Sequence, residues 1–160
     1  MDRLDRKILS LLQEDATLAV ADIAKKVGLS TTPCWRRIQK LEEDGVIYGR
    51  VALLNAERVN ASVNVFVSIR TGAHNIEWLK HFSEVVREFP EVVEFYRMSG
   101  DIDYLLRVVV PDIASYDRFY KKLISKIEIY DVSSTFAMEQ IKYTTSLPLD
   151  YMTIKKEAVD

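Results

Sequence analysis

The chain has 160 residues, of which 48% are hydrophobic and 29% are charged, and this balance indicates a globular fold of one ordinary domain or two small ones. No apolar run approaches the roughly 20 residues needed to cross a bilayer, and the first residues, MDRLDRKIL, do not resemble a signal peptide, so we expect a cytoplasmic protein without a membrane segment. The net charge of −2 argues weakly against binding of nucleic acid. The charge is not evenly distributed, however: residues 1–50 carry nine basic and eight acidic side chains, and residues 51–160 carry thirteen basic and sixteen acidic side chains. The placement of the amino-terminal cations therefore matters more than the total.

Two short helices are predicted at the amino terminus. Leu4, Ile8 and Leu11 recur at the spacing of one helical face, and Asp2 is placed to cap the first helix. The second helix is predicted over VADIAKKVG, where Gly28 suits the left-handed residue that ends many helices. The apolar faces of these helices need partners, which indicates a small helical domain.

A third helix is predicted within GLSTTPCWRRIQKLEEDG. Ser30 or Thr32 can cap it, and Pro33 is tolerated because the first turn of a helix does not need its N–H group. At about 100° per residue, its apolar side consists of Cys34, Ile38 and Leu41. Cys34 is therefore expected to pack in the core and not to act in redox chemistry.

The polar side of this third helix is the candidate surface for binding double-stranded DNA. Arginine can hold a guanine edge or a phosphate through two hydrogen bonds, glutamine suits adenine, and a helix fits the major groove. The alternative is an ordinary solvated helix face. Within a three-helix domain we favour DNA contact by the side chains on and beside this face, which are Ser30, Thr31, Thr32, Trp35, Arg36, Arg37, Gln39 and Lys40.

The chain changes character after residue 45. VIYGRVALLN alternates and is broken by Gly49, as a short hairpin or wing would be, and the residues to about Ala61 form a connector. Beyond it, strands are predicted over SVNVFVSI, EVVEFYRM, DYLLRVVV and DVSSTFAMEQIKYT, and helices over NIEWLKHFSEVVREF and SYDRFYKKLISKI. The order β-α-β-β-α-β is that of a ferredoxin-like domain. We therefore predict an α+β protein with a helix-turn-helix domain at 1–50, a connector at 51–61, a ferredoxin-like domain at 62–150 and a loosely ordered tail at 151–160.

One face of the predicted sheet is left uncovered, because both helices of a ferredoxin-like domain lie on the other face. The strands carry the large apolar residues Phe66, Phe95, Leu105 and Phe136, so we do not expect the open face of the sheet to remain exposed to solvent. Large exposed apolar patches commonly mark interfaces. We therefore predict a homodimer that forms sheet to sheet. The first helix of the domain is expected to bury one face, formed by Ile76, Leu79, Phe82, Val86 and Phe89.

Three segments, LDRKILSLLQEDA, IAKKVGLSTTPCWRRIQKLEEDGVI and MSGDIDYLLRVVVPD, follow one another within roughly 150 residues. Together they closely resemble the leucine-responsive and asparagine-responsive (Lrp/AsnC) family of transcription regulators. The resemblance implies an N-terminal winged helix-turn-helix domain, a ferredoxin-like βαββαβ effector-binding domain, and dimers that assemble into a homo-octamer. One departure is Ala19, where the family often has a serine that caps the second helix, and a lost cap typically costs about 1 kcal/mol.

A narrower resemblance lies in TTPCWRRIQKLEEDG, FYRMSGDIDYLLRV and FAMEQIKYTTSLPL. These segments are similar to the branch of the family whose best-known member regulates cysteine detoxification. The resemblance implies L-cysteine or a related sulfur amino acid as the effector, bound where two dimers meet.

The segment MSGDIDYLL can supply what an amino-acid pocket needs, namely donors for a carboxylate, acceptors for an ammonium and an apolar wall. Backbone N–H groups at Ser99, Gly100 and Asp101 can converge on the carboxylate, and Asp103 or Asp101 can accept from the ammonium. Tyr104 and Met98 are the candidate wall, and the family resemblance adds Thr135 and Ala137 on the last strand. The alternative for the loop is a plain hairpin turn.

Two other classes of protein compete with a DNA-binding regulator. A small ferredoxin-like enzyme is disfavoured because no nucleophile with a base, phosphate loop or metal-ligand set accompanies the acids of GDIDY, so no catalytic residue, metal or cofactor is assigned. An amino-acid-binding module without DNA function is disfavoured by the basic third helix. The expected partners are double-stranded DNA, a small amino acid and further copies of the chain. His74 and His81 receive no role.

Overall fold

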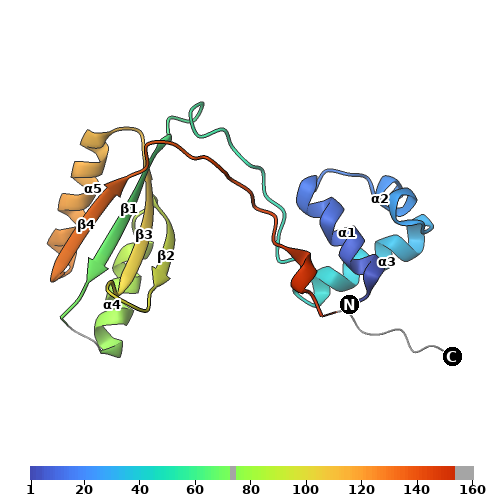
Figure 1. Cartoon of the computed structure of the whole chain (residues 1–160), viewed down its shortest axis with the longest axis horizontal. Helices are drawn as coiled ribbons and strands as arrows, with labels where there is room; N and C mark the ends of the chain where they lie inside the picture. Colours follow the sequence, from blue (N-terminus) through green and yellow to red (C-terminus); the bar gives the residue numbers. More distant parts are fainter. Residues whose placement is uncertain (73–74, 154–160) are drawn as a thin grey trace. The chain divides into compact units, whose positions relative to one another are not determined.

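A computed structural model describes residues 1–72 and 75–153, with helices and strands in the order α-α-α-β-α-β-β-α-β followed by a short 3₁₀ turn. The chain divides into two compact units: the first joins Met1–Ala52 to the segment that begins at Lys142, and the second is Leu53–Ile141 (Figure 1). His74 and residues 154–160 of the predicted tail lie outside the described residues. Within the described part of the chain, no helix is long and apolar enough to cross a membrane.

Three helices build the first unit: α1 (Arg3–Glu14), α2 (Val20–Val27) and α3 (Thr31–Glu43). Asp2 caps α1 as predicted, because its carboxylate accepts hydrogen bonds from the N–H groups of Leu4 and Asp5 at 2.8 and 2.9 Å. The Asp5 carboxylate in turn accepts from the Asp2 N–H at 2.8 Å, which completes a reciprocal capping box. The apolar sides of the three helices meet in a core that includes Ile8, Ile23, Val27, Cys34, Ile38 and Leu41.

A turn of three residues joins α2 to α3. Gly28 closes α2 with a φ of 78°, a conformation that glycine adopts without the strain of a side chain, and the Leu29 N–H donates to the Ala24 carbonyl at 2.9 Å. At the other end, α2 begins at Val20 although Ala19 forms no side-chain cap. The lost cap therefore does not displace the start of the helix, which buries Ile23, Ala24 and Val27.

The segment after residue 141 returns to the first unit and packs on α1. The side-chain amide of Gln13 donates to the Leu147 carbonyl at 3.2 Å and accepts from the Leu147 N–H at 2.7 Å. Arg6 forms an ion pair with Asp150 at 2.8 Å. The 3₁₀ turn η1 (Leu149–Tyr151) lies here, and the apolar contacts with the helical core are made by Leu149 and Met152. The structural boundary thus falls at residue 142, not at residue 150 as the sequence analysis placed it.

The hairpin predicted over VIYGRVALLN is not formed, since residues 44–62 contain turns and irregular backbone but no strand. Two short strands are only marginally stable without a third strand or a helix to cover them. Here the side chains of Tyr48, Val51 and Leu54 are 100%, 80% and 72% exposed, and of the apolar residues in the segment only Ile47 packs on the core among the described residues.

The second unit has a four-stranded antiparallel sheet with strand order β2-β3-β1-β4. This order and the helices between the strands are those of the predicted ferredoxin-like domain. In sequence the elements are β1 (Val63–Arg70), α4 (Ile76–Arg87), β2 (Val92–Arg97), β3 (Tyr104–Val110), α5 (Ile113–Lys126) and β4 (Asp131–Phe136).

Helices α4 and α5 lie against one side of the sheet, as Figure 1 shows. Alternate residues of the two central strands, such as Val65, Val67, Leu106 and Val108, are fully buried beneath them. Asn75 caps α4 by accepting a hydrogen bond from the Trp78 N–H, and the helix ends at Arg87, before Pro90. Ile76 is an exception to the predicted apolar face of α4, because at the first position of the helix its side chain is 85% exposed.

The opposite face of the sheet is more polar than predicted. Phe95 and Phe136 pack against the helix-covered core, so of the four predicted residues only Phe66 and Leu105 belong to the open face. Arg107 and Glu94 form an ion pair at 2.6 Å on that face. The alternation of side chains along a strand explains the difference, since the choice of face depends on register and not on hydrophobicity alone.

Candidate functional site

Helix α3 separates its side chains as the sequence predicted. Cys34, Ile38 and Leu41 are 0 to 3% exposed and join the helical core. Burial raises the pKa of the Cys34 thiol, although the positive charge of Arg37 acts in the opposite direction. The thiol is therefore a packing group, and the candidate surface of α3 is the side opposite these buried residues.

The exposed side of α3 presents hydroxyl groups at its start and cations along its length. Ser30 precedes the helix and forms no side-chain capping bond, Trp35 is 50% exposed, and Arg36 and Lys40 are exposed. Among the described residues, Arg36 and Lys40 have no hydrogen-bond or ion-pair partner, so their charges are available to an external anion. The other predicted members of this surface that are exposed are Thr31 and Thr32.

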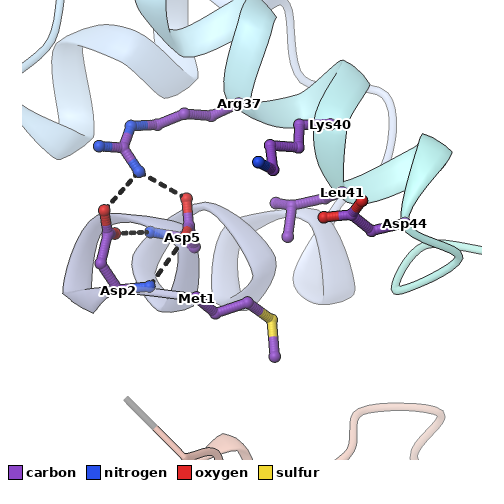
Figure 2. A pocket seen from close by; sticks show the side chains of 7 residues that line it. All are labelled: Met1, Asp2, Asp5, Arg37, Lys40, Leu41 and Asp44. Atoms are coloured by element: carbon purple, nitrogen blue, oxygen red, sulfur yellow. Dashed lines mark hydrogen bonds and ion pairs between the residues drawn. The ribbon is translucent and has the colours of Figure 1, made fainter. Parts of the chain in front are cut away.

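Arg37 differs from its neighbour Arg36. Its Nη1 atom lies 2.6 Å from Oδ2 of Asp2 and 2.7 Å from Oδ1 of Asp5, and Figure 2 shows the guanidinium reaching from α3 to the start of α1. Hydrogen bonds to Asp5 and then to Asp2 raise the pKa of Arg37. Arg37 was predicted as part of the DNA-binding surface, but here it is bound within the domain.

The second half of α3 is less suited to a polyanion. The Gln39 side chain is half-buried and donates to Glu42 at 3.0 Å, and Glu42 also pairs with Arg50 at 2.7 Å. Exposed Glu43 and Asp44 follow, and their negative charge repels phosphate. The exposed cations of α3, Arg36 and Lys40, therefore precede an acidic end of the helix.

The predicted ligand loop connects β2 to β3 and is hydrogen-bonded to the end of β1. The Asp103 N–H donates to the Ile69 carbonyl at 2.9 Å, and the Asp103 carboxylate accepts from the Thr71 N–H at 2.8 Å. The Met98 N–H donates to the Asp103 carbonyl at 2.8 Å, which closes the loop. Gly100 has a φ of 127°, a backbone conformation that residues other than glycine rarely adopt. Asp103 therefore has a structural role in this loop.

The structure brings only some of the predicted ligand-binding residues together. Met98, Ser99, Gly100 and Asp101 lie exposed in one loop. Tyr104 is 6% exposed, and its ring packs on Trp78, Phe82 and Phe95 with centroids 5.4 to 5.7 Å apart, so it cannot form the wall of an open pocket. The cause is again strand alternation, which turns Tyr104 towards the helices.

Thr135 and Ala137 lie near the other end of the sheet. Thr135 pairs with Phe66 of β1, and the Ala137 N–H donates to the Asn64 carbonyl, whereas the loop is attached at Ile69. At about 3.4 Å per residue, these positions are about 10 to 17 Å from the loop along β1 alone. Thr135 and Ala137 are therefore not in the same turn as the loop residues.

Sequence reasoning missed two features of the first unit. One is the bridge from Arg37 to Asp2 and Asp5, for which a signal existed: Arg37 falls between the buried positions 34, 38 and 41. The other is the return of residues 142–153, for which the pattern gave no signal beyond isolated apolar residues. No group of three or more potential metal ligands occurs among the described residues.

These observations define a class of protein. Residues 1–48 match the family described as winged helix-turn-helix DNA-binding, and residues 64–147 match the Lrp/AsnC ligand binding domain. With the exposed basic half of α3 they define a DNA-binding transcription regulator that carries a separate ligand-binding domain. The chain belongs to the Lrp/AsnC family.

Several proteins of this family are similar over nearly the whole chain. The DNA-binding transcriptional activator DecR of Escherichia coli K12 is 51% identical over 151 residues, covering 94% of this chain and 99% of DecR. The glutamate uptake regulatory protein of Zymomonas mobilis is 50% identical over 157 residues, covering 98% of this chain and 96% of the relative. These relatives are transcription regulators.

Solved structures agree with the fold. An AsnC family transcriptional regulator from Agrobacterium tumefaciens superposes with a TM-score of 0.93 at 81% identity, covering 96% of this chain and all of that chain. The L-Met complex of a transcriptional regulator from Neisseria meningitidis gives a TM-score of 0.90 at 34% identity, covering 96% and 99%. The predicted family and fold class are confirmed.

Proposed function

We propose that the first half of α3 is the recognition surface of this regulator and that Arg36 is its central contact. The observation that supports this is the contrast between adjacent arginines: Arg36 is exposed and without an intramolecular partner among the described residues, while Arg37 is held by two carboxylates. Thr31, Thr32 and Trp35 flank Arg36 with groups that suit phosphates and base edges. Lys40 adds a second exposed cation one turn further along.

The test is charge reversal at Arg36. A duplex selected from a random library by the unaltered protein serves as the probe, and binding is followed by fluorescence anisotropy over a series of salt concentrations. Arg36→Glu should weaken binding by at least about tenfold, because it removes a cation from the interface and adds an anion. Arg87→Glu, which makes the same change at an exposed position on α4, is the matched control. Unaltered binding by Arg36→Glu would show that Arg36 is not a contact to DNA and would reject this recognition surface.

The effector in this proposal is a small amino acid, with L-cysteine as the first candidate. The loop at 98–103 supports it, because exposed backbone at Ser99, Gly100 and Asp101 can accommodate a carboxylate and the acids can accept from an ammonium. The similarity to a regulator solved with L-Met also supports an amino acid in this domain. The separation of the loop from Thr135 is consistent with a site that takes residues from two copies.

A thermal-shift screen against the twenty amino acids tests this assignment. A ligand present at about 100 times its dissociation constant stabilises the native state by about 2.7 kcal/mol, which is readily measured as a rise in melting temperature. We expect a rise with L-cysteine. A screen in which no amino acid raises the melting temperature would contradict the proposal, and a rise with another amino acid alone would reassign the effector.

The open face of the sheet is the proposed contact between two copies, and further pairing of dimers would give an octamer. Phe66 and Tyr96 are 37% and 49% exposed on this face, beside the ion pair of Arg107 with Glu94. Phe66→Asp should lower the mass measured by light scattering, because a carboxylate at the centre of the contact would lose its water. Tyr130→Asp, at an 81% exposed position after α5, is the control. A monomeric mass for the unaltered protein would reject the proposal.

A further inference from the structure

Arg37 joins α3 to the start of α1 through two short, charge-assisted contacts. The 2.6 and 2.7 Å distances from one nitrogen to two carboxylates lie in the range of strong hydrogen bonds between ions. The bridge lines a hollow of about 360 Å³ between the two helices, shown in Figure 2. Its side chains are one-third exposed or less, so the pair is shielded more than a surface salt bridge is.

The two carboxylates are fixed by their own helix. Oδ1 of Asp2 accepts from the N–H groups of Leu4 and Asp5, and Oδ2 of Asp5 accepts from the Asp2 N–H, which leaves the other oxygen of each to face Arg37. They cannot turn away without disrupting the cap of α1. The burial of Asp2 opposes its ionisation, but the Asp5 N–H and the Arg37 guanidinium together lower its pKa.

The Arg37 guanidinium is already neutralised at this position. One guanidinium and two carboxylates give the bridge itself a net charge of −1, and Met1, Lys40 and Asp44 also line the hollow. A duplex that contacted Arg37 would therefore also meet Asp2 and Asp5. Arg36, the next residue, points about 100° away around the helix axis and is exposed. The two arginines therefore face different partners: DNA for one and α1 for the other.

We propose that Arg37 is a positioning residue for DNA recognition, which fixes the rotation of α3 about its axis through Asp2 and Asp5. Apolar packing by Cys34, Ile38 and Leu41 holds α3 to the core but is not directional. Contacts to two fixed carboxylates have a direction, and they determine where the next side chain points. The inference rests on the proposed role of Arg36.

The experiment compares Arg37→Gln with Arg36→Gln on the selected duplex and on an unrelated duplex, over a range of salt. Removing a phosphate contact lowers the slope of log affinity against log salt by about one and weakens both duplexes alike. Arg36→Gln should lower the slope in this way and, because Arg36 is proposed to reach base edges as well as phosphates, should weaken the selected duplex more than the unrelated one. For Arg37→Gln we expect an unchanged slope, an affinity for the selected duplex lowered by about tenfold, and an affinity for the unrelated duplex within about twofold of the original. Arg37→Lys, which keeps the charge, should restore part of the loss.

Asp2→Asn gives a result of opposite sign for the two possible roles of Arg37. Asparagine is an equally good helix cap, so this variant keeps α1 intact and removes only one charge from the bridge. If Arg37 positions α3, Asp2→Asn weakens binding to the selected duplex. If Arg37 contacts DNA and is merely masked, the variant frees it and binding tightens. Glu14→Gln, an exposed change of equal charge at the end of α1, is the control.

Three outcomes overturn the proposal. They are a loss of salt slope in Arg37→Gln equal to that in Arg36→Gln, no change in selected binding by Arg37→Gln, and tighter binding by Asp2→Asn than by its control. Should Arg37→Gln fail to fold, the sign of the Asp2→Asn effect still decides. A normal slope and affinity in Arg36→Gln would instead refute the role of Arg36, and so failure of the two proposals can be told apart.

Discussion

The contact of residues 142–153 with the helical unit can be tested by changing one side chain. Leu149 is partly buried against the helical core, and full burial of a leucine contributes about 1.5–3 kcal/mol. Leu149→Ala should therefore destabilise the first unit by about 1–2 kcal/mol. For a domain of this size, 1 kcal/mol corresponds to about 4–8 °C in melting temperature. We expect the first unit to melt roughly 5–15 °C lower.

The matched control lies two residues away. Leu147 is held through its backbone by Gln13, but its side chain is 71% exposed, so Leu147→Ala removes the same atoms from a position in water. Such surface changes usually alter stability by no more than about 0.5 kcal/mol. The pair of variants thus separates burial of the side chain from a general effect on the segment.

The two tryptophans allow each unit to be followed separately. Trp35 lies in the first unit and Trp78 in the second, where it packs on Phe82 at 4.9 Å. Urea unfolding monitored by fluorescence in a Trp78→Phe background reports the first unit, and a Trp35→Phe background reports the second. The reasoning is refuted if Leu149→Ala and Leu147→Ala have equal effects on the first unit, or if Leu149→Ala destabilises only the second.

Three further outcomes are expected. The Cys34 thiol is buried and its pKa is raised, so a thiol reagent such as DTNB should label it near pH 8 only as fast as the first unit opens; rapid labelling of the native protein would contradict its burial. The pKa of Asp2 is lowered in the native state, because the Asp5 N–H and Arg37 outweigh the opposing effect of burial. The ionised Asp2 carboxylate therefore stabilises the first unit at pH values above the ordinary pKa of 3.8, and this stabilisation is lost as the pH falls below it. In Asp2→Asn, the free energy of unfolding followed by Trp35 fluorescence should fall less steeply at acid pH. In the ligand loop, Asp103→Asn keeps an oxygen for the Thr71 N–H but removes the charge, so it should abolish the thermal shift with the amino acid while the second unit melts normally. Asp103→Ala should lower both the thermal shift and the melting temperature of the second unit. A thermal shift in Asp103→Asn equal to that of the unaltered protein would argue against an ammonium contact.

Features set by local sequence were predicted correctly. The Asp2 cap, the Gly28 turn and the buried face of α3 depend on residues within one or two turns of each other. The β-α-β-β-α-β order follows from the change between two-residue and helical periodicity, and it was sufficient to identify the second unit.

Features that depend on distant partners were not predictable in the same way. Phe95 is as apolar as Phe66, and only the register of the sheet assigns Phe95 to the core and Phe66 to the open face. Arg37 and Arg36 are chemically identical neighbours, and only the position of α1 distinguishes them. Burial of residue 149 requires knowledge of a contact more than 100 positions away along the chain.

The order of synthesis gives the returning C-terminal segment a further consequence. The ribosome completes the ferredoxin-like unit, Leu53–Ile141, before it makes Leu149 and Met152, which pack against the core of the helical unit. The unit made first is thus the last to acquire all of its parts. A chain ending near residue 141 would carry all four strands of the sheet but would lack the contacts that Leu149 and Met152 make with the helical core.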